Sequence, residues 1–127
     1  GPVGALAIGA AAGVLCFLAS ARLKRRLGYD DALDVFGVHG VGGIVGALLT
    51  GVFASSTLGG VGFAEGMGMA TQVGAQALAV ALTCAWSGAV TAASLWLISK
   101  FVALRVDAEA ETDGLDLALH DERGYNL

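Results

Sequence analysis

The chain has 127 residues, of which 56% are hydrophobic and only 14% are charged, and its mean hydropathy is +0.74. Soluble domains usually carry about 25% charged residues, so the composition excludes an ordinary soluble domain and indicates a membrane protein. The formal net charge is −4. Because no basic stripe with interleaved aromatic residues is present, nucleic-acid binding is not expected.

Three long runs without Lys, Arg, Asp or Glu predict transmembrane helices. They cover residues 3–21, 35–54 and 66–99, and about 20 apolar residues cross a bilayer as a helix. The third run would be about 51 Å long if fully helical, so it must tilt, project from the membrane or begin as a loop. Helices buried in a soluble protein are the alternative, but they would need only shorter runs.

We therefore predict an all-α fold, a polytopic membrane helix-bundle fragment with three transmembrane helices and a C-terminal tail. The transmembrane part covers residues 1–106, with spans at about 3–21, 35–54 and 66–104, and the tail covers residues 107–127. Glycine pairs four residues apart, Gly9/Gly13 and Gly42/Gly46, allow helix backbones to approach closely. They occur on more than one helix, which indicates that the chain is part of a larger bundle.

The distribution of basic residues predicts the orientation. Four of the seven bases lie between Arg22 and Arg26, whereas the connection 55–65 contains neither Lys nor Arg. Lys100 and Arg105 follow the third run. Because positively charged loops stay in the cytoplasm, we expect a multi-pass protein of the cell membrane that starts outside. The acidic tail, which carries seven of the eleven acids, is then cytoplasmic.

The second run contains a single ionisable residue, His39. An ionisable group at membrane depth is costly and normally faces a protein-lined cavity or pathway. Helical spacing would place Val35, His39, Gly42 and Gly46 on one face, which we interpret as the wall of a narrow apolar passage. Three roles stay open for His39: a packing residue satisfied by a hydrogen bond, a haem or metal ligand, or a polar group in a conduction pathway.

We favour the pathway role because a single histidine is an incomplete metal site, and we expect no metal or cofactor. Asp30, Asp31 and Asp34 precede the run, where acids can cap free N–H groups and complement the helix dipole. At about 100° per residue, Asp34 would lie about 140° from His39. We expect Asp34 to anchor neighbouring backbone or the tail; a role in admitting cations is the alternative.

Residues 30–54, DDALDVFGVHGVGGIVGALLTGVFA, closely resemble the tenth transmembrane helix of the ammonium transporters, the Amt/Mep/Rh superfamily. Residues 58–64, LGGVGFA, resemble the following external loop, and the tail sequences GLD and HDERGY resemble the cytoplasmic C-terminal motif. The resemblance implies helices nine to eleven and the tail of an eleven-helix transporter for nitrogen uptake, not an enzyme. Such transporters are homotrimers with one pore per subunit.

The resemblance also implies a mechanism in which ammonium loses a proton and neutral ammonia crosses a hydrophobic pore. His39 matches the second of two mid-pore histidines, and Val35 would keep the lower passage dry. The partner histidine and the external selectivity site belong to helices absent from this chain, so the piece alone should not transport ammonium. Two other classes of protein stay open: a membrane redox or haem-anchoring bundle with His39 as ligand, and a non-catalytic module whose role is to pack against other helices.

The same resemblance implies that the tail is regulatory: it would pack beneath the bundle, couple subunits and bind a PII-type nitrogen-signalling protein. The residues implied are Gly114, Leu115, Asp116, His120, Glu122 and Tyr125. Asp121 stands where the family usually has Gly, and Gly124 where it has Ala. If the glycine is needed for a left-handed backbone, Asp is among the better substitutes. The alternative is a disordered, solvating acidic tail.

Overall fold

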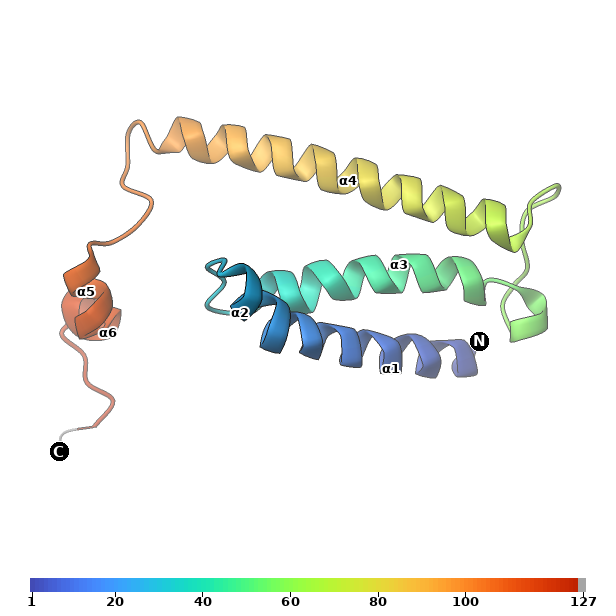
Figure 1. Cartoon of the computed structure of the whole chain (residues 1–127), viewed down its shortest axis with the longest axis horizontal. Helices are drawn as coiled ribbons and strands as arrows, with labels where there is room; N and C mark the ends of the chain where they lie inside the picture. Colours follow the sequence, from blue (N-terminus) through green and yellow to red (C-terminus); the bar gives the residue numbers. More distant parts are fainter. Residues whose placement is uncertain (126–127) are drawn as a thin grey trace. The chain divides into compact units, whose positions relative to one another are not determined.

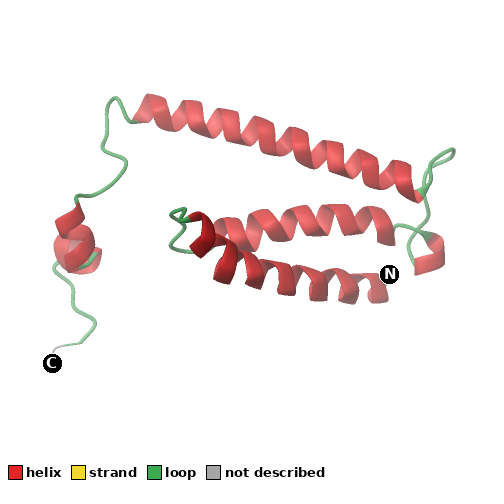
Figure 2. Cartoon of the chain, in the orientation of Figure 1, coloured by secondary structure: helices red, strands yellow, loops and turns green. Residues whose placement is uncertain are grey.

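The computed structural model describes residues 1–125, and within that range it is helical and contains no strand, which confirms the all-α prediction (Figures 1 and 2). Two of its elements, η1 and η2, are π-turns, and η3 is a 3₁₀ turn. The elements, in chain order, are α1 (Pro2–Leu18), η1 (Ala19–Leu23), α2 (Lys24–Leu27), η2 (Phe36–Gly40), α3 (Val41–Phe53), η3 (Ser56–Leu58), α4 (Met69–Ile98), α5 (Ala108–Asp113) and α6 (Leu115–His120).

Three helical stretches among residues 1–125 are long and apolar enough to cross a membrane: Pro2–Leu27, Phe36–Phe53 and Met69–Ile98. Their most apolar windows have mean hydropathies of 2.1, 1.7 and 1.6. The first helix is longer than the predicted span because it continues through the basic stretch and stops only at Gly28, whose φ of 66° is left-handed. The third helix begins after a loop and ends six residues before the predicted limit at residue 104.

The chain divides into two units, residues 1–84 and 85–127. In the first unit α1 and α3 pack side by side in opposite directions (Figure 1). Small residues allow this close packing, as expected between membrane helices. A Cβ atom added to Gly4 would lie 3.1 Å from Cβ of Phe53, and one added to Gly42 would lie 3.1 Å from Sγ of Cys16.

The other predicted small-residue positions are open in this chain. Among the described residues 1–125, a Cβ atom at Gly9, Gly13 or Gly46 would meet nothing within 4 Å. The start of α4 does approach α3, because a Cβ atom at Gly51 would lie 3.3 Å from Cα of Val73. Gly42 and Gly51 thus explain contacts made within residues 1–84, whereas the open glycines leave smooth surface for other helices.

The loop from α3 to α4 begins with a turn that contains polar side chains. Ser55 is buried, and its hydroxyl lies 2.8 Å from that of Thr57. A side chain at Gly60 is impossible without rearrangement, since its Cβ would lie 2.3 Å from the carbonyl oxygens of Phe53 and Ala54. This turn therefore requires glycine for close backbone approach rather than for flexibility.

Residues 85–125 contain the end of α4 and the tail helices. The Lys100 ammonium lies 5.1 Å from the centroid of the Trp96 ring, an arrangement typical of a membrane interface. The Asp107 carboxylate caps α5 by accepting the Ala110 N–H at 2.8 Å, and Arg105 pairs with Glu111. The cap and the ion pair stabilise α5, and α6 follows and ends at His120. The last two residues of the predicted tail, 126 and 127, lie outside the described residues.

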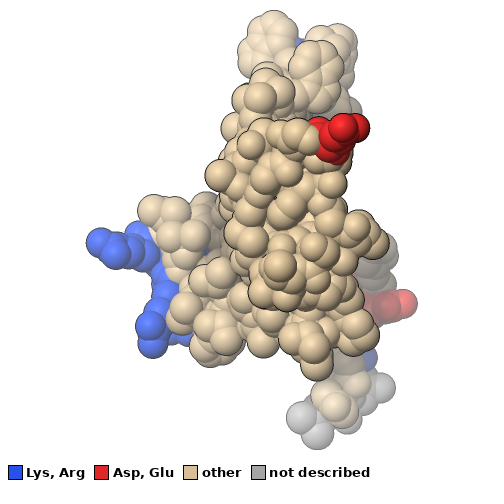
Figure 3. Space-filling model, turned by 90° about the vertical axis from the view of Figure 1, so that its right-hand side faces the viewer, with Lys and Arg blue, Asp and Glu red and all other residues tan. Residues whose placement is uncertain are grey.

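Many large apolar side chains are exposed, more than is usual for a protein surrounded by water. Large side chains such as Leu6 and Trp86 are 75% and 74% exposed. Figure 3 shows a face of mostly uncharged atoms, with most of the visible Lys and Arg side chains gathered at one edge. Contiguous exposed apolar surface of this kind marks contact with lipid or with other helices.

Candidate functional site

His39 lies in the π-turn η2 (Phe36–Gly40), which the sequence pattern did not predict. A π-turn bonds i to i+5, so it accommodates one residue more than an α-helical turn, and such turns occur frequently at functional sites. The regular 3.6-residue spacing that would align Val35, His39, Gly42 and Gly46 is therefore interrupted at the histidine itself.

The four residues that the sequence placed on one face have different surroundings in this chain. His39 and Val35 are exposed, Val35 by 51%. Gly42 instead packs against Cys16 of α1, while Gly46 is open. Within this chain, His39 and Val35 thus belong to an uncovered apolar surface, and the predicted glycine face is divided between helix packing and open surface.

Asp31 fixes the start of the helix that carries His39. Its two carboxylate oxygens accept the N–H groups of Val35 and Phe36 at 2.8 and 2.9 Å. These are N–H groups that the first helical turn leaves without a backbone partner. The prediction that an acid of this cluster caps the helix is confirmed for Asp31.

Asp34 does not lie on the helix, so its predicted angle to His39 does not apply. Its backbone has a left-handed φ of 54°, which is unusual for a residue other than glycine. Its carboxylate accepts a hydrogen bond from Nζ of Lys24 at 2.8 Å, and the same ammonium donates to the Asp31 carbonyl. The Asp34 carboxylate is therefore held by the side chain of Lys24 on α2.

Sequence reasoning used Lys24 only to predict orientation and missed this pairing. Lys24 and Asp34 are ten residues apart, and a left-handed turn at Gly28 separates them. A lysine and an acid flanking a glycine between two apolar runs is the signal that could have indicated it. The pairing closes the connection between α1–α2 and the helix that carries His39.

The two π-turns, η1 and η2, contact one another. The buried Gly37 of η2 makes this possible, because a Cβ atom there would lie 2.3 Å from Oγ and 3.1 Å from the backbone nitrogen of Ser20. On another side of η2, the rings of Phe36 and Tyr29 meet edge to face at a centroid distance of 5.8 Å. Close backbone contact and an aromatic pair thus hold the turn that presents His39.

The predicted tail residues lie on and around α6. Leu115, Asp116 and His120 belong to the helix, and the Glu122 N–H donates to the Asp116 carbonyl at 3.1 Å. Gly114 has a φ of 96° between α5 and α6. Asp121 ends the helix with a left-handed φ of 51°, the backbone that the expected glycine would adopt. The side chain of Tyr125 is exposed.

No group of three or more His, Cys, Asp or Glu side chains that could hold a metal ion occurs within residues 1–125. The functional candidates of the first unit are an exposed imidazole on an apolar helix and, at the start of that helix, a capping carboxylate and an ion pair.

Comparison with known proteins identifies relatives along nearly the whole chain. The model of the Ammonium Transporter Family matches residues 1–125. The chain is 46% identical over 127 residues to an ammonium transporter of Aquifex aeolicus, 40% over 126 residues to one of Bacillus subtilis, and 48% over 133 residues to one of Mycobacterium tuberculosis. These alignments cover 98% of this chain and between 28% and 31% of the relatives, so the chain spans about three-tenths of their length.

Proposed function

Because this chain belongs to the ammonium transporter family, we propose that it supplies one wall of an ammonia-conducting passage in a multi-pass membrane protein. The observation that carries the proposal is His39, an imidazole exposed on an otherwise apolar membrane helix. Ionisable groups at membrane depth normally face a pathway and not lipid. Helices contributed from outside this chain complete the passage.

The chemistry of the cargo explains why a histidine suits an apolar wall. Ammonium is small and strongly hydrated, so its transfer as a bare ion through an apolar passage is too costly. Potassium is nearly the same size, but unlike ammonium it cannot lose a proton. A passage that removes the proton and conducts neutral ammonia therefore rejects potassium. The imidazole serves this passage because it can donate at one ring nitrogen and accept at the other.

Val35 keeps the passage dry beside His39, and the capped start of η2 holds both residues in place. Val35 follows Asp34 directly, and its N–H is bound by the Asp31 carboxylate. The turn η2 begins at the next residue. The apolar wall and the imidazole are thus positioned by the same capping carboxylate.

The test replaces His39 in the protein expressed from its complete reading frame, in cells that lack ammonium uptake. We expect His39→Ala and His39→Leu to lower uptake about 10²-fold, the lower range for loss of a group that transfers protons, or to abolish discrimination against potassium. Val38→Ala, on the same turn, is the matched control and should retain both properties. Unchanged uptake and selectivity in both His39 variants would exclude a role in the passage. A Soret band in the purified protein would instead favour haem ligation.

The tail is the regulatory part of the same proposal. It is cytoplasmic, α6 couples neighbouring subunits of a homotrimer, and this segment binds a PII-type signalling protein. The ordered backbone from Asp107 to His120 and the left-handed Asp121 support a segment with a defined shape. Deletion of residues 113–127 should change uptake or PII binding. If both stay the same, the tail has no regulatory role.

A further inference from the structure

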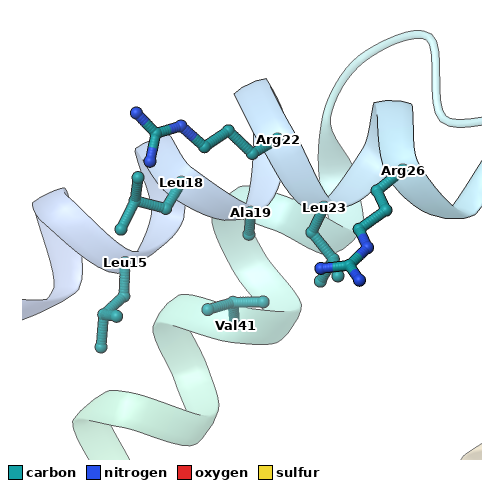
Figure 4. A pocket seen from close by; sticks show the side chains of 7 residues that line it. All are labelled: Leu15, Leu18, Ala19, Arg22, Leu23, Arg26 and Val41. Carbon is teal, nitrogen blue, oxygen red and sulfur yellow. The ribbon is translucent and has the colours of Figure 1, made fainter.

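The end of the π-turn η2 lies against η1 of the first helical stretch. Ala19 of η1 is buried, and in Figure 4 its side chain points towards Val41, the residue that follows η2. The N–H group of Val41 bonds to the Phe36 carbonyl, five residues earlier, and also to the Val38 carbonyl, three residues earlier. A regular α-helix would use the carbonyl of residue 37 instead. This shared N–H group therefore marks the point at which η2 departs from α-helical hydrogen bonding.

A second donor reaches the Val38 carbonyl from the neighbouring helix. The thiol of Cys16 on α1 donates to it, with 3.4 Å between sulfur and oxygen. A carbonyl oxygen has two lone pairs, so it can accept both the thiol and the N–H group of Val41. Because the thiol uses part of this capacity, the Val41 N–H group bonds more readily to the Phe36 carbonyl, and that five-residue bond is the one that defines a π-turn.

The half-buried side chain of Cys16 touches the same helix at a second point. A Cβ atom at Gly42 would lie 3.1 Å from Sγ of Cys16. The thiol thus contacts the helix one residue before and three residues after His39. Each residue turns a helix by about 100°, so a shift of the extra residue of η2 past His39 would rotate the imidazole by up to about 100°.

We propose that Cys16 is a positioning residue for His39: its thiol stabilises the π-turn that sets the direction of the imidazole. The inference rests on the proposed function, in which His39 lines the passage. A thiol is a weak donor, so it adjusts a turn whose main support comes from the Gly37 contact and the Asp31 cap. Loss of a bond of this kind changes an equilibrium about two- to fivefold.

The experiment measures ammonium uptake per amount of protein in the membrane, for variants of the protein expressed from its complete reading frame. Cys16→Ala removes the donor, and we expect it to lower uptake about two- to fivefold. Cys16→Ser keeps a hydroxyl donor and should restore most of the loss. Cys84→Ala is the matched control, because it removes an exposed thiol from α4, and it should leave uptake unchanged.

A double-mutant cycle separates positioning of His39 from packing. If Cys16 acts through the imidazole, Cys16→Ala should cause no further loss in a His39→Ala background. Three results would overturn the proposal: the same fold loss with and without the imidazole, equal losses in Cys16→Ala and Cys16→Ser, or full uptake in Cys16→Ala.

Hydrogen exchange of the backbone, followed by mass spectrometry, provides a readout that does not depend on uptake. Exchange reports local opening, so Cys16→Ala should speed exchange of the amides of residues 36–41 about two- to fivefold, whereas Cys84→Ala should not. Unchanged exchange in Cys16→Ala would overturn the inference even where His39→Ala lowers uptake. Unchanged uptake in the His39 variants would instead mark failure of the proposed function, so the two failures are distinguishable.

Discussion

The capped start of the second membrane helix and the π-turn that follows it differ in how their polar groups are used. At its start, Asp31 and Asp34 are both bound within the chain, by backbone N–H groups and by Lys24. A few residues further on, His39 is exposed on an apolar surface. We propose that the two places have different roles, because bound polar groups hold the helix whereas an exposed imidazole on a membrane-spanning helix is available for chemistry.

Gly37 should give the largest effect, since it holds the turn that presents His39. In Gly37→Ala the new Cβ would lie 2.3 Å from Oγ of Ser20 and 3.1 Å from its backbone nitrogen. Overpacking of this kind costs about 1–3 kcal/mol, and we expect the upper end because backbone is involved. Thermal unfolding in detergent measures the loss. Gly43→Ala, where an added Cβ meets nothing within 4 Å in residues 1–125, should lose less stability; an equal loss there would contradict the contact.

The Asp31 cap should have the next largest effect. Asp31→Ala removes both hydrogen bonds to the Val35 and Phe36 N–H groups, and loss of an N-terminal cap costs about 0.5–2 kcal/mol. Asp31→Asn keeps one acceptor oxygen and should lose less. The two variants are compared by chemical unfolding of the full-length protein. If both are as stable as the unchanged protein, Asp31 is not required as a cap.

The ion pair between Lys24 and Asp34 should have the smallest effect. Its side chains are 28% and 40% exposed, and solvent screening limits such pairs to about 0–1 kcal/mol. Lys24→Met should therefore lower the free energy of unfolding by less than Asp31→Ala does, and less still in 1 M salt, where charges are screened. A larger loss in Lys24→Met than in Asp31→Ala would show that the pair, and not the cap, holds the connection.

The sequence was sufficient to predict the membrane-spanning helices, because such spans depend on length and apolarity, which are local properties. It also indicated a helix cap within the acidic cluster, though not which acid provides it. It did not reveal the π-turn around His39, since apolar residues at three- and four-residue intervals look the same with or without one extra residue. The contacts of Lys24 with Asp34 and of Gly42 with Cys16 depend on how the chain reverses direction, and no local pattern encodes that reversal.

The matched π-turns also constrain how this pair of helices can change in evolution. Each of η1 and η2 contains one residue more than an α-helical turn would, and the two turns contact one another. Deleting one of these extra residues would rotate the rest of that helix by about 100° relative to its neighbour. An insertion or deletion in either helix should therefore survive only when the other helix changes in step.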